Sequence, residues 1–204
     1  MKAGGYEKGY ASCDYFWGKK PADFVVKAAE LLSGSASLFA IDFGCGDGKN
    51  TNYLSSNGFD VTAVDISLVA IENAKKLWDV KNVDWIVSDL RTYEPTKKGN
   101  DLVLATGSPH CLSSEEEVST LIDKMKDSLR SGGFLVLYSF NDEDHDFNGH
   151  ESDFNPILLP HSWYLKKLNG FKVILESNVT QGDIHPDTNI EHHHSITRIL
   201  AKKM

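Results

Sequence analysis

Short apolar runs alternate with amphipathic stretches along most of the chain. Runs of apolar or alternating residues bounded by glycine or polar residues are typical of strands, and apolar residues every three or four positions are typical of helices. Helices are predicted between Pro21 and Gly34, over 49–56, and after the caps Ser67 and Ser114. The predicted strands that alternate with them are 38–41, 59–65, 83–87, 101–105 and 134–140. Such alternation predicts an α/β fold with a parallel sheet and right-handed crossovers.

The C-terminal part of the chain departs from this alternation. A short helix is predicted over 162–168, followed by strands at 171–176 and 194–201 with a polar loop, 179–189, between them. Because no helical pattern separates these two strands, we expect an antiparallel hairpin that closes the sheet. Residues 141–160 are acidic and irregular, and we expect them to form a variable loop at the substrate site.

A glycine-rich turn follows the first strand. Gly44, Gly46 and Gly48 stand at every second position after Asp42, a spacing that suggests close approach of a bound molecule to the backbone. The dinucleotide fingerprint GxGxxG needs its third glycine one position later, where this chain has Lys49. The turn therefore favours another cofactor, and a nucleotide-cofactor oxidoreductase stays open as a less favoured alternative.

Two carboxylates follow at the ends of the next two strands. Asp65 closes the strand 59–65, where it could accept two hydrogen bonds from ribose hydroxyls. Asp89 follows the strand 83–87, where it could accept an adenine amino group. Ligands of open α/β sheets bind beyond the carboxyl ends of the strands, so we expect both residues beside the glycine turn.

The order of these features resembles the class I S-adenosylmethionine (SAM) methyltransferases over nearly the whole chain. The resemblance implies one Rossmann-like domain over 1–204, a three-layer sandwich around a mostly parallel sheet of seven strands in the order 3-2-1-4-5-7-6. It implies SAM as the cofactor and S-adenosylhomocysteine as its product. The residues expected at the cofactor are Asp42, Gly44, Cys45, Gly46, Gly48, Asp65, Ile66, Asp89, Leu90, Thr106 and Trp17.

Motifs at both ends of the chain are similar to the small tellurite-resistance methyltransferases, which act on tellurium and selenium oxyanions and related soft nucleophiles. These motifs are Tyr15-Phe16-Trp17-Gly18, Ser88-Asp89-Leu90-Arg91 and Gly182-Asp183-Ile184-His185. His185 matches a histidine that lies near the methyl group in that subgroup, whereas Pro186 stands in place of its arginine. The loop therefore lacks the bidentate group that grips an oxyanion, and the subgroup's substrate is not carried over.

Two histidines are candidates for the position over the transferable methyl group. His110 follows the strand 101–105 and His185 precedes the last strand, and both segments are expected at the carboxyl edge of the sheet. Methyl transfer from a sulfonium is a displacement for which the protein mainly supplies alignment. A thiolate or selenide acceptor needs no base, whereas a hydroxyl or amine would need one, and histidine can serve near neutral pH. Cys111 beside His110 is a further candidate nucleophile.

Aromatic residues and histidines are concentrated in three further segments. We expect residues 1–20, with five aromatic side chains, to form a helical lid over the cofactor. The acidic run Asp142–Asp146 with His150 could hold a metal, but we expect a solvated loop and no metal site. His192 and His194 would share one face of a strand, which we expect to lie at the surface.

The amino-acid composition of the chain limits the kinds of partner that we expect it to bind. The 204 residues are 41% hydrophobic with a net charge of −8, which argues against a basic nucleic-acid-binding surface. The chain has no run of membrane-spanning length, and its three separated cysteines suit a reducing compartment. We expect a cytoplasmic monomer or homodimer that methylates a small molecule, with a soft sulfur, selenium or tellurium nucleophile as one class of acceptor. A catalytically silent SAM-binding protein, such as a sensor or an assembly subunit, is the main alternative.

Overall fold

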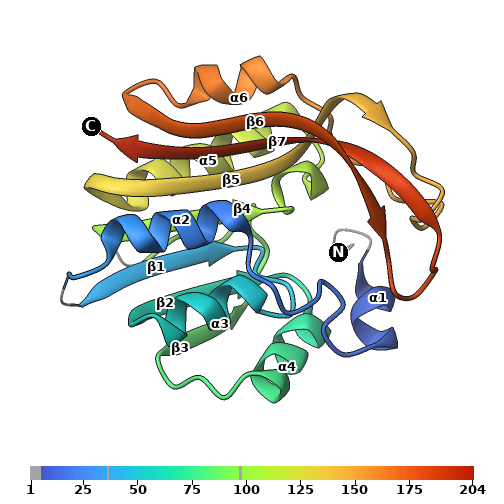
Figure 1. Ribbon diagram of the computed structural model, residues 1–204, viewed down its shortest axis with the longest axis horizontal. Coiled ribbons are helices and arrows are strands. Elements are labelled where there is room, and N and C mark those ends of the chain that lie inside the picture. Colours follow the sequence, from blue (N-terminus) through green and yellow to red (C-terminus); the bar gives the residue numbers. More distant parts are fainter. Residues whose placement is uncertain (1–5, 36, 97) are drawn as a thin grey trace.

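A twisted sheet of seven strands in the order β3-β2-β1-β4-β5-β7-β6 runs through the centre of the computed structural model, which describes residues 6–35, 37–96 and 98–204 (Figure 1). Strands β1 to β5 pair in parallel, and β7 pairs antiparallel to both β5 and β6. The predicted strand order and terminal hairpin are confirmed. The strands are β1 (Leu38–Phe43), β2 (Phe59–Asp65), β3 (Val83–Val87), β4 (Asn100–Thr106), β5 (Leu129–His145), β6 (Phe171–Ile184) and β7 (Glu191–Lys203).

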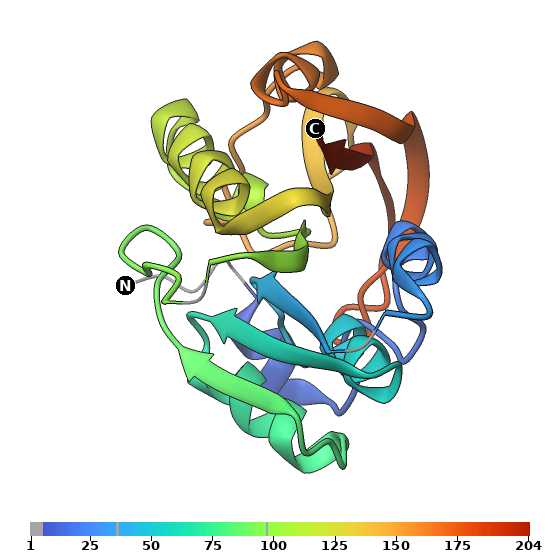
Figure 2. The same cartoon turned by 90° about the vertical axis from the view of Figure 1, so that its left-hand side faces the viewer.

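Helices cover both faces of this sheet, which gives the predicted three layers (Figure 2). The helices are α1 (Glu7–Ser12), α2 (Asp23–Leu32), α3 (Lys49–Ser56), α4 (Leu68–Leu77), α5 (Glu115–Ser128) and α6 (His161–Lys167), with a 3₁₀ turn η1 (Pro109–Cys111) after β4. The predicted caps are present, because Ser67 Oγ accepts from the Ala70 amide and Ser114 Oγ from the Glu117 amide. None of the described helices is long and apolar enough to cross a membrane.

The central strands are buried from both sides, as their continuous apolar runs require. In β4, Leu102 and Leu104 pack in the core that includes α2, while Val103 and Ala105 pack in the core that includes α5 and α6. All four side chains are fully buried. This burial holds the strand rigidly, so the loops at its carboxyl end have a fixed base on which to form a site.

The last three strands are longer than the sequence predicted. Residues 141–145 belong to β5, and residues 179–184, expected in a loop, continue β6. The β6–β7 pairing continues beyond the apolar start of β6 to Ile184↔Glu191, because ladder hydrogen bonds satisfy the backbone whatever the side chains are. His192 and His194 share a face as predicted, but with exposed fractions of 5% and 1% they are buried rather than at the surface.

The extended ends of β6 and β7 reach the N-terminal segment. In Figure 1 these ends project beyond the other strands and lie next to α1. The His185 ring, just after β6, lies 5.6 Å from each of the Phe16 and Trp17 rings. The first and last segments of the chain therefore meet over the carboxyl edge of the sheet.

Candidate functional site

A cavity of about 1740 Å³ lies at the carboxyl ends of the parallel strands. Its walls come from the glycine turn, the ends of β2 and β4, the N-terminal segment and the ends of β6 and β7. Asp42 and Gly48 were expected at the cofactor, but they are not among the described residues that line the cavity. The predicted residues that do line the cavity are Trp17, Gly44, Cys45, Gly46, Asp65, Ile66, Asp89, Leu90, Thr106, His110 and His185.

The three glycines of the turn each lie close to protein side chains. All three have left-handed φ values, and a Cβ at Gly44 would lie 2.3 Å from Cβ of Ser108. A Cβ at Gly46 would lie 2.8 Å from the Tyr10 hydroxyl, and one at Gly48 would lie 2.7 Å from a tryptophan ring of β3. The glycine spacing therefore lets the loop after β4, the N-terminal segment and β3 pack on the turn.

Asp65 ties the glycine turn to the start of α4. Its Oδ2 accepts from the Gly46 amide at 2.8 Å and its Oδ1 accepts from the Ser67 amide at 2.9 Å. Burial raises the pKa of this carboxyl group, which is only 9% exposed. Each carboxylate oxygen keeps a second lone pair, so two hydroxyl groups of a ligand could still donate to it from the cavity.

Asp42 lies under the turn instead of beside the cofactor cavity. It sits on the central strand β1, fully buried between β2 and β4, and it is not among the described residues that line the cavity. Its Oδ2 accepts from Thr51 Oγ1 at 2.8 Å, while its Oδ1 has no hydrogen-bond partner within the described residues. Burial raises the pKa of Asp42 to about 7.

This buried carboxyl group is expected to make stability fall as the pH rises toward 7. The folded pKa of Asp42, about 7, lies above its ordinary value of 3.8. The stabilisation is therefore complete below about pH 4 and is lost as the pH rises through the folded pKa, at about 1.4 kcal/mol per pH unit. Urea unfolding of the wild type and Asp42→Asn at pH 5, 6 and 7 measures this slope. Asp42→Asn should lack this pH-dependent contribution to the free energy of unfolding. Equal slopes of that free energy against pH in the two proteins would contradict the prediction.

Two charged residues of the turn, Asp47 and Lys49, also line the cavity and were not predicted as site residues. The Trp17 amide donates to Asp47 Oδ2 at 3.4 Å, and Lys49 Nζ donates to the Trp17 carbonyl at 3.1 Å. Asp47 Oδ1 is buried with no partner in the described part of the chain. Burial raises the pKa of Asp47 and lowers that of Lys49. The signal in the sequence was the presence of two charged residues inside a glycine turn. Asp47 could bind an ammonium group of a ligand, and Lys49 could bind a carboxylate group.

Asp89 is held by a neighbour from its own motif. Arg91 donates to both carboxylate oxygens, with Nε 2.9 Å from each of them and Nη2 2.5 Å from Oδ2. The hydrogen bonds from Arg91 lower the pKa of Asp89, so this carboxylate stays charged. Leu90 between them is buried, and the pair presents a fixed acceptor beside an apolar surface.

His110 lines the cavity but is poorly suited to act as a base. Its Nδ1 accepts from the Phe140 amide at 3.1 Å, and its ring stacks on Phe140 with centroids 3.8 Å apart. Burial lowers its pKa to about 3, so the ring is neutral with its proton on Nε2. Burial likewise raises the pKa of the Cys111 thiol to about 12, which removes the thiolate that a nucleophile requires.

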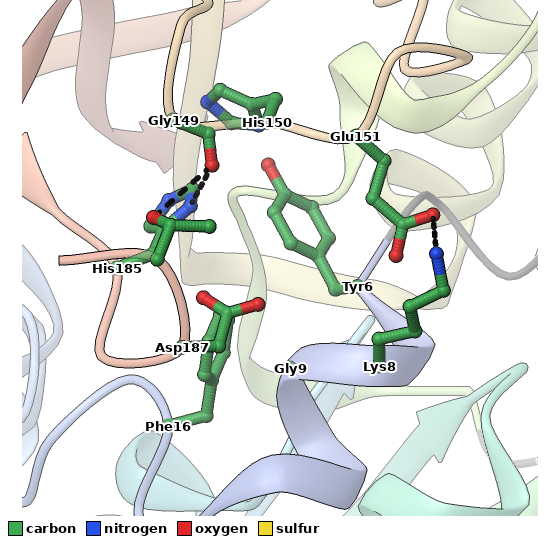
Figure 3. A pocket seen from close by; sticks show the side chains of 10 residues that line it. Tyr6, Lys8, Gly9, Phe16, Gly149, His150, Glu151, His185 and Asp187 are labelled. Atoms are coloured by element: carbon green, nitrogen blue, oxygen red, sulfur yellow. Dashed lines mark hydrogen bonds and ion pairs between the residues drawn. The ribbon is translucent and has the colours of Figure 1, made fainter. Parts of the chain in front are cut away.

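His185 lies where the two ends of the chain meet. Its Nδ1 is 3.3 Å from the Gly149 carbonyl and its Nε2 is 3.5 Å from Asp183 Oδ2. It also lines a second pocket of about 220 Å³, shown in Figure 3, whose other side is formed by Tyr6 and Phe16. Both ring nitrogens thus lie near oxygen atoms that can accept a hydrogen bond.

An arginine reaches the cavity from β7, although the 179–189 segment has none. Arg198 lines the cavity, and its Nε donates to Ser177 Oγ at 2.8 Å. Its Nη1 lies 3.2 Å from Asp23 Oδ2. The sequence placed this residue in the last strand, but only the antiparallel pairing brings that strand to the cavity.

Known proteins that are similar to this chain in sequence or in fold are named as methyltransferases. Residues 40–133 match the family described as "Methyltransferase domain". The "Probable S-adenosyl-L-methionine-dependent methyltransferase TehB" of Haemophilus influenzae is 28% identical over 169 residues, which cover 79% of this chain and 54% of that protein. The chain therefore spans about half the length of this relative.

Two solved structures show the same fold. The crystal structure of TehB from Haemophilus influenzae matches with a TM-score of 0.72 and 18% identity over 88% of this chain and 61% of that one. The N-methyltransferase NodS from Bradyrhizobium japonicum, solved in complex with S-adenosyl-L-homocysteine, matches with a TM-score of 0.61 and 18% identity over 95% of both chains.

Proposed function

We propose that this chain is a class I SAM-dependent methyltransferase that transfers the methyl group of SAM to a small-molecule acceptor. The match of residues 40–133 to a methyltransferase-domain family and the similarity to TehB support this proposal. One observation carries the proposal. A single cavity of about 1740 Å³ connects Asp65 and the glycine turn with His185, just after β6, and with Arg198 on β7. A cofactor and a small acceptor can meet in such a space.

Different residues of the cavity would bind different parts of the cofactor. The free lone pairs of Asp65 suit ribose hydroxyls, and Asp89 suits the adenine amino group. Asp47 and Lys49 offer opposite charges to the ammonium and carboxylate of the methionine part. When bound, SAM supplies an activated methyl group on a sulfonium, and the N-terminal segment excludes water from above the turn.

The acceptor end of the cavity favours a soft nucleophile. His110 carries its proton on Nε2 and keeps no basic nitrogen free, because Nδ1 accepts from the Phe140 amide. Cys111 stays a thiol, since burial holds its pKa near 12. A thiolate or selenide brings its own reactive lone pair and needs no base. Arg198 and His185 would orient such an anion toward the methyl group.

A transfer assay with methyl-labelled SAM tests this function. Incubation with thiols, selenite, tellurite, phenols and amines should label thiols or selenium compounds in preference to phenols and amines. His185→Ala should lower turnover by about 100-fold because acceptor alignment is lost, with little change in SAM affinity. Calorimetric titration with SAM and S-adenosylhomocysteine measures that affinity.

Each part of the proposal has its own contrary outcome. The matched control is His161→Ala, because His161 is half-buried on α6 and does not belong to the cavity walls as described. Unchanged turnover in His185→Ala would remove this residue from the acceptor site. Binding of SAM without transfer to any acceptor would favour a silent SAM-binding protein. Failure to bind either nucleoside well above micromolar concentration would contradict the function itself.

A further inference from the structure

We propose that His150, His192 and His194 form a binding site for one divalent transition-metal ion, with Zn²⁺ as the best match. The three residues come from the loop after β5 and from the first part of β7. Their ligand nitrogens lie within 4.8 Å of one another. The proposal does not depend on the cofactor or on methyl transfer, because neither takes part in it.

Two of the three rings already point reactive nitrogens at each other. His150 Nε2 and His194 Nε2 are 2.9 Å apart, so one shared proton must lie between them when no metal is bound. The His192 ring packs edge-on against both rings, with centroids 5.1 Å from His150 and 4.9 Å from His194. His192 Nε2 is buried and has no hydrogen-bond partner anywhere in the described ranges. An unpaired buried nitrogen is costly, and a metal ion would satisfy it.

The hydrogen bonds around the site leave lone pairs on the Nε2 atoms of His192 and His194, while His150 Nε2 carries the shared proton that a metal ion would displace. His192 Nδ1 lies 2.8 Å from the Ile190 carbonyl, to which only a protonated nitrogen can donate, so Nε2 carries the lone pair. His145 donates from Nε2 to the Asn141 carbonyl at 2.7 Å, which leaves its Nδ1 as an acceptor for His194 Nδ1 at 3.2 Å. His194 Nε2 therefore also carries a lone pair. Metal-bound histidines characteristically donate their second ring nitrogen in this way.

Phenylalanine rings hold the imidazoles in place. His194 stacks on Phe140 with centroids 4.2 Å apart, and His150 stacks on Phe154 at 4.4 Å. These contacts restrict the rotation of both rings and keep water away from the nitrogens. An apolar shell of this kind preorganises a site and lowers its local dielectric constant.

The donor set favours a borderline ion over a hard one. Imidazole nitrogens suit Zn²⁺, Cu²⁺ and Ni²⁺, whereas Mg²⁺ and Ca²⁺ prefer oxygen ligands. A tetrahedral Zn²⁺ with Zn–N distances of about 2.0–2.1 Å needs nitrogens roughly 3.3 Å apart, which small ring shifts would give. Asp183 and His185 lie next to His192 in a second group whose ligand atoms are also within 4.8 Å of one another. The Asp183 carboxylate of this group could complete the coordination.

Titration of the chelator-treated protein with Zn²⁺, followed by calorimetry, tests the site. We expect one ion per chain and a melting temperature about 5–10 °C higher at a free metal concentration 100-fold above the dissociation constant. Co²⁺ should give the visible absorption of a tetrahedral nitrogen site. His192→Gln and His194→Gln should each weaken binding by at least about tenfold.

The matched control is His193→Gln, on the same strand between the two ligands. His193 is half-buried and its Nε2 lies 3.1 Å from Asp144 Oδ2, away from the three proposed ligands, so its loss should leave metal affinity unchanged. If a β7 variant does not fold, His150→Gln in the loop replaces it, with circular dichroism of the metal-free protein as the check on folding. Absence of stoichiometric binding, or equal affinity in the triad variants and the wild type, would overturn the proposal.

Discussion

Replacing Asp65 with alanine is expected to lower the affinity for SAM by at least about 100-fold. The carboxylate is the proposed acceptor for two ribose hydroxyls, and it also accepts from the Gly46 and Ser67 amides at 2.8 and 2.9 Å. Hydrogen bonds to a charged group contribute about 1.5–3 kcal/mol each, so loss of two corresponds to at least about 3 kcal/mol. Isothermal titration with SAM and with S-adenosylhomocysteine measures this loss.

Two further variants make the Asp65 result specific. Asp60→Ala removes an exposed carboxylate from the same strand and should leave affinity unchanged. Asp65→Asn keeps one acceptor oxygen and should give an intermediate loss. A folded Asp65→Ala protein that binds SAM as tightly as the wild type would show that the carboxylate does not hold the ribose.

Replacing Gly44 with alanine is expected to destabilise the protein by about 2–5 kcal/mol. Gly44 has φ +76°, a left-handed value that costs a non-glycine residue about 1–2 kcal/mol. The new Cβ would also lie 2.3 Å from Cβ of Ser108, whose hydroxyl donates to the Phe43 carbonyl at 2.6 Å. Overpacking in such a place costs a further 1–3 kcal/mol or so. Urea unfolding followed by circular dichroism measures the free energy.

Gly58 offers a matched control for backbone strain alone. Its φ is +86°, but no described atom lies within 4 Å of the position of a Cβ. Gly58→Ala should therefore cost only about 1–2 kcal/mol. Adding Ser108→Gly to Gly44→Ala should restore the part that is due to the clash. Equal destabilisation by Gly44→Ala and Gly58→Ala would show that the loop after β4 does not press on the turn.

The boundaries of the local elements followed closely from the sequence. The helix 49–56 and the strands 59–65 and 83–87 have the predicted limits in α3, β2 and β3. Each is bounded by a strong local signal, such as the glycine turn before α3 and Asn57-Gly58 after it. Burial within a helix followed less closely, because Leu68 is 55% exposed at the first turn of α4.

Predictions about contacts between distant segments were less successful. Asp42 and Gly48 belong to the glycine motif, yet they face the protein instead of the cavity, because strand β1 is central and α4 packs beneath the turn. Arg198 and Asp47 reach the cavity, although the motifs did not assign them. Sequence spacing specifies which residues share a turn or a face, but not which neighbour covers each one.

The sequence by itself determined the α/β class, the strand order through its family resemblance, the antiparallel hairpin and the residues of the glycine turn. These follow from periodicity and turn chemistry, which act between residues close in the chain. The tertiary structure alone decided the length of β6 and the tautomer of His110. It also brought His150 to His192 and His194. Backbone pairing and burial between segments far apart produce these features, and such contacts leave no periodic signal in the sequence.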